Sequence, residues 1–208
     1  MKIGMIVAMD KELQQLRPLF PEYKVILQKS GIGKVNAAIQ TVEMIRQYKP
    51  DVIISSGCAG GNGDDIHVQD VVVSTELAYH DVYCGTAIGH SVYGQVQGLP
   101  ARFEADPYLL EKARQTGAKP GLIVTGDWFV DSKEKMREII GHFPEAKAVD
   151  MESAAIAQTC YINKVPFISF RVISDIPLRD TDASMYHDFW NTIAQNSFQV
   201  TKTFIESL

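Results

Sequence analysis

The sequence predicts a single α/β domain with a mostly parallel or mixed sheet over residues 1–208. Short runs rich in Val and Ile alternate with longer stretches of helical periodicity, which is typical of this class. The runs in the first and last thirds of the chain are apolar on both faces, as strands are when helices cover both sides of a sheet. The length suits one compact domain, and no repeat or linker-like segment divides it.

Strands and helices are expected to alternate along most of the chain. The strands are expected at residues 2–8, 24–27, 51–56, 70–75, 122–125 and 166–174. The helices are expected at residues 10–19, 33–48, 107–117, 132–142, 150–163 and 187–207. Asp106 and Ser132 are N-cap residue types at two of the helix starts. Segment 79–103 lacks periodicity and is too long for a plain connection, which indicates a functional role.

The last expected helix has the clearest 3.6-residue period. Its stripe consists of Phe189, Ile193, Phe198, Thr201, Phe204 and Ile205. Such a stripe predicts one continuous helix that covers a face of the sheet.

The composition excludes several classes of protein. With 46% hydrophobic and 22% charged residues the chain is not disordered, and a net charge of −5 disfavours non-specific nucleic-acid binding. Asp10 and Glu12 interrupt the first apolar run where a signal peptide would continue, and no run reaches the roughly 18 apolar residues of a membrane helix. Three widely spaced cysteines without a CxxC motif indicate neither disulfides nor zinc. We expect a cytoplasmic protein that binds neither nucleic acid nor a membrane.

Residues capable of chemistry follow five of the expected strands. They are Met9 to Glu12, the glycine-rich turn at 56–61, Glu76 with residues 79–81, residues 126–129, and Asp175. Because ligands of open α/β sheets bind beyond the carboxyl ends of the strands, these residues are expected to share one rim. The rim then carries carboxylates, aromatic rings and small turns without a matching group of basic residues.

Helix capping is the alternative explanation for each of these carboxylates. Asp127 fits capping well, because a helix is expected to begin soon after it. Asp175 fits it less well, since a loop is expected after that residue. Glu12 and Glu152 lie in expected first helical turns, where the helix dipole also favours a carboxylate. Position alone leaves capping and function open for these two residues.

Other chemical motifs are missing from the sequence. Gly31 and Gly33 form a GxG, but Asn36 stands at the third glycine position of a dinucleotide-binding loop, and no Walker A spacing occurs. The five histidines have no i, i+4 pair, and there is no GxSxG nucleophile elbow. We therefore expect no metal and no organic cofactor.

Seven segments together form a specific pattern. They are MKIGMIVAMDKELQQL at 1–16, SGIGKVNAA at 30–38, SSGCAGG at 55–61, VVVSTELAYHD at 71–81, GDWFVDS at 126–132, AVDMESAAIAQTC at 148–160 and VPFISFRVISD at 165–175. In order and over nearly the whole chain, they resemble 5′-methylthioadenosine/S-adenosylhomocysteine nucleosidases of the purine nucleoside phosphorylase superfamily. The resemblance implies a single three-layer α/β/α domain with a mixed central sheet and a nucleoside phosphorylase-like fold.

The resemblance also implies a reaction, the hydrolysis of the N-glycosidic bond of an adenine nucleoside with water as co-substrate. Asp175 matches the family's acid, which protonates N7 of the purine. Glu12 matches the base that activates the attacking water, and Glu152 matches the carboxylate that accepts hydrogen bonds from the ribose hydroxyls. A place in the first turn of a helix would suit Glu152 to remaining ionised.

Further residues are expected to bind the substrate by the same resemblance. They are Met9, Ile32, Cys58, Ala59, Gly60, Phe129, Val130, Met151, Arg171, Ser174 and Tyr186. Phe129 resembles the residue that stacks on adenine, and Met9 with Ile32 resembles the lining for the 5′-thioalkyl group. Met185 is the alternative to Tyr186, one residue away. Cys58 stands where the family commonly has Ser, so the edge of the site lacks a good hydroxyl donor and acceptor.

Three other functions stay open at this point. A nucleoside phosphorylase of the same fold would need cationic side chains at a phosphate site, for which Lys34 is the only nearby candidate. A futalosine hydrolase is compatible with the unusual segment 83–96, and a nucleoside-binding module without activity would leave Glu12 idle. The resemblance also implies a homodimer, with segment 83–100 either at its interface or acting as a mobile lid on a monomer.

Overall fold

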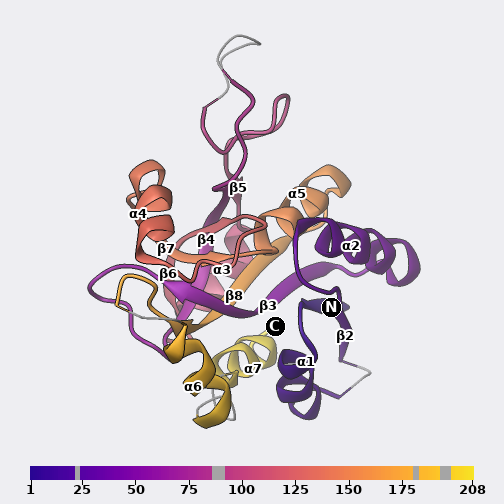
Figure 1. The fold of residues 1–208 in the computed structure, drawn as a ribbon. Helices are drawn as coiled ribbons and strands as arrows, with labels where there is room; N and C mark the ends of the chain where they lie inside the picture. Colours follow the sequence, from indigo (N-terminus) through magenta and orange to yellow (C-terminus); the bar gives the residue numbers. More distant parts are fainter. Residues whose placement is uncertain (22–23, 86–91, 180–182, 193–197) are drawn as a thin grey trace.

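The computed structural model describes residues 1–21, 24–85, 92–179, 183–192 and 198–208. One mixed sheet forms its centre, and helices cover both faces of that sheet (Figure 1). The strands are β1 (Ile3–Val7), β2 (Val25–Lys29), β3 (Val52–Gly61), β4 (Val71–Tyr79), β5 (Phe103–Glu104), β6 (Lys119–Thr125), β7 (Ala146–Asp150) and β8 (Phe167–Asp175). The expected α/β class with a mixed central sheet is confirmed.

The helices agree with the sequence in the first three quarters of the chain. They are α1 (Asp10–Leu16), which continues as the 3₁₀ turn η1 (Arg17–Leu19), then α2 (Lys34–Tyr48), α3 (Pro107–Arg114), α4 (Lys133–His142), α5 (Ser153–Asn163), α6 (Ser184–Thr192) and α7 (Gln199–Glu206). The Asp106 side chain accepts a hydrogen bond from Leu109 N, and that of Ser132 accepts one from Lys135 N. Both residues therefore cap their helices as predicted.

Five strands of the sheet close into a ring. Strand β3 pairs with β8, β8 with β4, β4 with β6, β6 with β7, and β7 again with the last two residues of β3. Strands β1 and β2 extend the sheet from β3 in parallel, and β5 pairs with the end of β4. The closure brings the end of β3 beside the carboxyl ends of β7 and β8.

Alternation along the strands sends side chains to both faces of the sheet. On β3, Val52 and Ile54 pack with α1, α3, α6 and α7, whereas Ile53 packs with α2 and α5. A third cluster lies between α4 and strands β6 and β7. Helices on both faces explain why these strands carry apolar residues at successive positions.

Two parts of the fold differ from the expectation. The helix expected at 187–207 is wrong, because α6 ends at Thr192 and Phe198 lies in a turn before α7. Residue Ile193 of the expected stripe lies outside the described residues. The helix expected at 150–163 begins only at Ser153, because residues 146–150 form β7. Strand β7 is only five residues long and contains Lys147, so its pattern does not stand out in the sequence.

Residues 80–85 and 92–102, between β4 and β5, project away from the body of the molecule (Figure 1). Gly94 N donates a hydrogen bond to Val82 O across the base of this projection. Residues 86–91 of the expected functional segment lie outside the described part. No helix among the described residues has the length and apolar character needed to cross a bilayer.

Candidate active site

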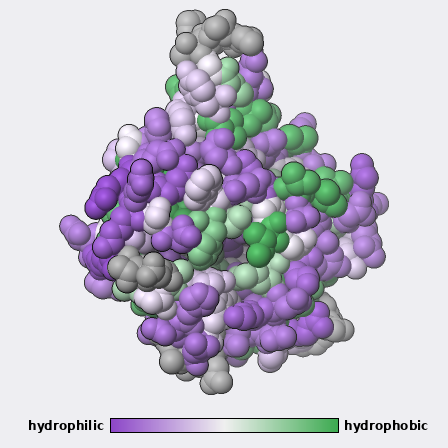
Figure 2. Space-filling model, in the orientation of Figure 1, coloured by the Kyte–Doolittle hydropathy of each residue, from purple (hydrophilic) through white to green (hydrophobic). Residues whose placement is uncertain are grey.

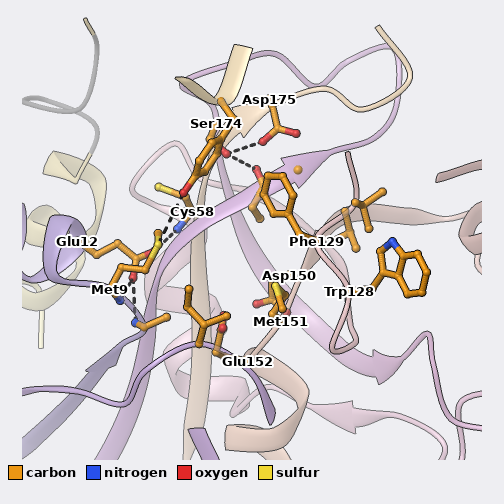
Figure 3. A pocket seen from close by; sticks show the side chains of 17 residues that line it. Met9, Glu12, Cys58, Trp128, Phe129, Asp150, Met151, Glu152, Ser174 and Asp175 are labelled. Atoms are coloured by element: carbon orange, nitrogen blue, oxygen red, sulfur yellow. Dashed lines mark hydrogen bonds between the residues drawn. The ribbon is translucent and has the colours of Figure 1, made fainter. Parts of the chain in front are cut away.

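One pocket collects most of the expected site residues at the carboxyl ends of β1, β6, β7 and β8. It is lined by Ala8, Met9, Glu12, Ile32, Cys58, Ala59, Gly60, Trp128, Phe129, Val130, Val149, Asp150, Met151, Glu152, Ser174, Asp175 and Tyr186. Figure 3 shows Glu12, Glu152 and Asp175 approaching it from three sides. The surface view shows the same region as a central hollow with apolar side chains around it (Figure 2). Four of the five expected groups therefore share this rim, whereas Glu76 and residues 79–81 do not line the pocket.

Glu12 is held by three backbone N–H groups. It is the third residue of α1, and its Oε2 accepts hydrogen bonds from Ala8 N and Met9 N at 2.9 Å. Its Oε1 accepts one from Cys58 N on β3 at 2.9 Å. Burial raises the pKa of Glu12, and this outweighs the opposing effects of Arg171 and the three N–H groups. Glu12 thus caps its own helix and also presents a fixed carboxylate to the pocket.

Glu152 lies at the N-cap position of α5, two residues after the end of β7. Its Oε1 accepts a hydrogen bond from Gly33 N at 2.9 Å, although the two residues are 119 positions apart in the sequence. Burial, helped by the nearby charge of Asp150, raises the pKa of Glu152 to about 8. Burial thus acts on this pKa more strongly than the position at the start of a helix does.

Asp175 is the last residue of β8 and is buried. The register between β3 and β8 shifts here, because Ala59 pairs with Ile173 whereas Gly60 pairs with Asp175. Such a bulge redirects side chains at the end of a strand. Ser174 Oγ donates a hydrogen bond to Asp175 Oδ1 at 2.6 Å. No helix follows Asp175 directly, so the capping explanation does not apply to it.

Arg171 does not line the pocket but lies buried behind it. Its Nε donates to Asp150 Oδ2 at 2.6 Å, and its Nη2 donates to Ser55 Oγ at 2.9 Å. Burial would lower the pKa of Arg171, but the charges of Asp150, Glu152 and Glu12 raise it overall. The guanidinium therefore acts on the pocket carboxylates through its charge.

Aromatic rings form the opposite wall. The ring centroids of Phe129 and Tyr186 are 5.3 Å apart at an interplanar angle of 71°. Tyr186 OH donates to Met9 Sδ at 3.7 Å, whereas Met185 packs into the core that α2 and α5 cover. The choice between these two neighbours therefore falls on Tyr186. Trp128 also lines the pocket, with Lys135 Nζ 4.7 Å from its ring centroid.

Cys58 faces the pocket as a neutral thiol. Burial, with the nearby charge of Glu12, raises its pKa well above the usual range. A thiol without thiolate character is a weak nucleophile and a weak hydrogen-bond donor. Among the described residues, no group of three or more His, Cys, Asp or Glu is arranged to hold a metal ion.

Three pocket residues, Ala8, Val149 and Asp150, were missed in the sequence, and Trp128 was expected on the rim without a binding role. Ala8 directly precedes the expected site residue Met9. Val149 and Asp150 are the last two residues of β7, a strand that the sequence pattern did not indicate. Asp127, expected to cap the following helix, instead accepts a hydrogen bond from Lys34 N at the start of α2.

Comparisons with known proteins agree with this geometry. The family model described as the phosphorylase superfamily matches residues 2–206. The 5′-methylthioadenosine/S-adenosylhomocysteine nucleosidase of Exiguobacterium sp. is 42% identical over 222 aligned residues, which cover 95% of this chain and 94% of the relative.

Two solved structures illustrate the range of the similarity. The nucleosidase of the same description from Neisseria meningitidis, in complex with methylthio-immucillin-A, has a TM-score of 0.90 and 39% identity, and covers 100% of this chain and 99% of its own. The futalosine hydrolase of Helicobacter pylori has a TM-score of 0.88 at 27% identity, and covers 100% of this chain and 98% of its own.

Proposed function

The chain belongs to the phosphorylase superfamily and, within it, to the 5′-methylthioadenosine/S-adenosylhomocysteine nucleosidases, and on this basis we propose that it hydrolyses the N-glycosidic bond of one or both of these nucleosides. The products are adenine and a ribose that keeps its 5′-thio substituent. One observation carries the proposal for this chain. Glu12, Glu152 and Asp175 are far apart in the sequence and line one pocket with an aromatic wall.

Asp175 is proposed as the general acid. Adenine is a poor leaving group as an anion, so a proton delivered to its N7 lowers the barrier to breaking the bond. The electron pair of the bond between N9 and C1′ then stays with a neutral adenine. The buried position of Asp175 beside Ser174 supports this role, because a group shielded from water delivers its proton to the substrate rather than to solvent.

Glu12 is proposed as the general base. It takes one proton from the attacking water, and the remaining hydroxide oxygen bonds to C1′. The pKa raised by burial makes its carboxylate a stronger base than one in water. The three backbone N–H donors fix its direction, so little reorganisation is needed when the water reacts.

Glu152 is proposed to accept hydrogen bonds from the ribose hydroxyls. Gly33 N already occupies its Oε1, and new donors from the substrate would favour the ionised form. The resulting anion stabilises the positive charge that develops on the sugar ring. With a ligand-free pKa of about 8, Glu152 is expected to release a proton when substrate binds near neutral pH.

The remaining pocket residues are proposed to bind the nucleoside. Phe129 stacks on adenine with Val130 at its edge, Met151 lies under the ribose, and Met9, Ile32 and Tyr186 surround the 5′ group. Cys58, Ala59, Gly60 and Ser174 form the floor, and Arg171 supports the carboxylates from behind. The position of all but Arg171 on the pocket wall supports this assignment.

The reaction is tested by release of the free base, with and without phosphate: adenine from methylthioadenosine and adenosylhomocysteine, and hypoxanthine from inosine and futalosine. We expect release from the first two substrates in phosphate-free buffer. No lysine or arginine lines the described pocket, which disfavours a phosphate site. Strict dependence on phosphate would identify a phosphorylase, and turnover of futalosine alone would identify a futalosine hydrolase.

Asp175→Asn tests the role of the acid. Turnover is expected to fall about a hundredfold or more, because the amide cannot donate a carboxyl proton. The melting temperature should change little, since the amide keeps the shape of the side chain. Asp131→Asn, at an exposed position outside the pocket, is the matched control. Equal activity of the two variants would contradict the assignment.

The proposal includes a homodimer. Val35 and Ile39 are exposed on one side of α2, Ile32 is exposed in the turn before it, and Tyr83 and Val92 are exposed between β4 and β5. Large apolar side chains that recur on one surface are typical of an interface. The cytoplasmic location also remains a prediction, supported by three free cysteines.

A further inference from the structure

Three charged residues next to the pocket are not explained by the chemistry above. Lys34, Asp81 and Asp127 do not line the pocket, yet they come from three separate elements and contact one another. Lys34 is the first residue of α2, Asp81 follows β4 by two residues, and Asp127 follows β6 by two residues. We call these three residues the charged clamp.

The clamp is closed by side-chain and backbone hydrogen bonds. Lys34 Nζ donates to both carboxylate oxygens of Asp81 at 2.7 Å, and Asp81 Oδ2 accepts from Asp127 N at 2.8 Å. Asp127 Oδ1 in turn accepts from Lys34 N at 2.8 Å. Lys34 Nζ also lies 5.4 Å from the ring centroid of Tyr79. The Lys34 and Asp81 side chains are only 22% and 24% exposed, so their interaction is partly shielded from solvent.

The clamp holds the start of α2, which cannot cap itself. Gly33 at the N-cap has no side chain, and its φ of +95° is a conformation that favours glycine. Carboxylates from other elements replace the missing cap, since Glu152 accepts from Gly33 N and Asp127 accepts from Lys34 N. A Cβ at Gly33 would lie 3.0 Å from Asp127 Oδ1. The helix start is therefore fixed by distant parts of the chain.

Two residues of the clamp, Lys34 and Asp127, lie next to segments that line the pocket. Ile32 precedes Gly33 and lines one side, while Trp128 and Phe129 follow Asp127 and line another. The same helix start donates to Glu152, whose other carboxylate oxygen is left for a ligand. A shift of either segment would change the spacing between the aromatic wall and the residues around the ribose.

We propose that the charged clamp is a positioning device that sets the distance between the Ile32–Gly33 turn and the Trp128–Phe129 wall. The inference rests on the proposed nucleosidase function only for its kinetic test. The affinity for adenine depends on the same distance between the two walls and is measured without turnover. Lys34, Asp81 and Asp127 are positioning residues, since they act through the walls and do not line the pocket.

The molecule contains a matched control pair at the other end of the same two strands. Lys119 Nζ donates to Asp70 Oδ2 at 2.7 Å, with side chains 36% and 26% exposed. Asp70 directly precedes β4 and Lys119 begins β6, so this pair joins the strands away from the pocket. Asp70 also accepts from a backbone group, His67 N, as Asp81 does from Asp127 N.

Asp81→Ala and Asp70→Ala are compared by melting temperature, adenine affinity in calorimetry, and kinetics with methylthioadenosine. We expect similar losses of melting temperature. Only Asp81→Ala should raise KM and the adenine Kd, by about tenfold, with kcat within about threefold of the wild type, because a loosened pocket loses uniform binding. Equal KM and Kd values in the two variants would overturn the proposal.

Lys34 supplies a second test if Asp81→Ala does not fold. Lys34→Met keeps the backbone N–H to Asp127 and the apolar stem but removes the ammonium, and Lys119→Met is its control. Lys34→Arg, which keeps a cation for Asp81, should retain more adenine affinity than Lys34→Met. The proposal is contradicted if Lys34→Arg binds adenine as weakly as Lys34→Met does, or if Lys34→Met binds it as tightly as Lys119→Met does.

If the wild-type protein binds adenine but releases none from nucleosides, the proposed function fails. The comparison of adenine affinities among the variants still tests the clamp in that case.

Discussion

The carboxyl groups of the pocket differ in how they are bound, and this separates their roles. Glu12 accepts three backbone N–H groups, whereas Glu152 accepts one. Arg171 is the only buried arginine or lysine in the described chain, and it pairs directly with Asp150. The charge of Arg171 lowers the pKa of Glu12 and of Glu152, but burial has the larger effect and raises both.

Glu152→Gln is expected to stabilise the ligand-free protein. The unfolded chain ionises this carboxyl near its ordinary pKa of 4.5, whereas the folded chain keeps it protonated up to a pKa of about 8. Folding thus takes up a proton in this window, so the wild type loses stability as the pH rises through it. The amide removes this loss, with a gain of roughly 1–3 kcal/mol at the upper end of the window.

Urea unfolding at the two ends of this window measures the effect. The gain should be small near the lower end and should grow toward the upper end. Glu104→Gln, at an exposed position of β5, controls for the removed charge. A gain that does not change with pH would show that Glu152 is ionised in both states. Activity of Glu152→Gln should fall, since the amide cannot supply the anion.

Gly57→Ala is expected to impair activity more than folding. A Cβ at this position on β3 would lie 2.5 Å from Glu12 Oε1 and 2.9 Å from Arg171 Nη1. The base would have to move away from the attacking water, so kcat should fall about tenfold or more, as for a misplaced catalytic group. Gly141→Ala on α4, where an added Cβ meets nothing within 4 Å, is the control. Unchanged kcat in Gly57→Ala would show that Glu12 need not hold its present position.

At the scale of elements, local sequence signals specified some helix ends but not others. Asp106 and Ser132 start α3 and α4 with their own side chains. Helix α2 instead starts at a glycine and takes its caps from Asp127 and Glu152, which are distant in the sequence. Helix starts of the first kind can be predicted from neighbouring residues, whereas the start of α2 depends on the assembled fold.

Asp106→Ala tests a locally specified helix start. Loss of the hydrogen bond from Leu109 N should lower the free energy of unfolding by about 1 kcal/mol. The pocket is formed by other elements, so kcat/KM should not change. Urea unfolding provides the measurement, with Glu111→Ala at an exposed position within α3 as the control. A loss no larger than that of the control would mean that packing alone holds this helix start.

At the scale of the molecule, the closed ring of strands places the three carboxylates together. Glu12 follows β1, Glu152 follows β7 and Asp175 ends β8, while the bend of β3 brings Cys58 N to Glu12. The ring depends on β7, which connects β6 to the end of β3. A strand that was not recognised in the sequence is therefore central to the site.

The proposed homodimer gives a prediction at the same scale. Val35 and Ile39 are 69% and 59% exposed, a large apolar area for a free helix surface. The wild-type protein should have about twice the chain mass of 23.1 kDa in light scattering. Val35→Asp with Ile39→Asp should give a monomer, whereas Glu111→Ala at an exposed position on α3 should not. A wild-type mass of one chain would contradict the dimer.

The sequence by itself determined the α/β class, the order of most elements, the locally capped helices and the residue types of the site. These depend on periodicity, on neighbouring residues and on motifs, all of which are local along the chain. Only the tertiary structure decided the ring closed by β7, the break between α6 and α7, and the position of Arg171 behind the pocket. It also decided that burial raises the pKa of Glu152 and that Asp127 caps α2. These outcomes depend on burial and on contacts between residues far apart in sequence, which no local pattern encodes.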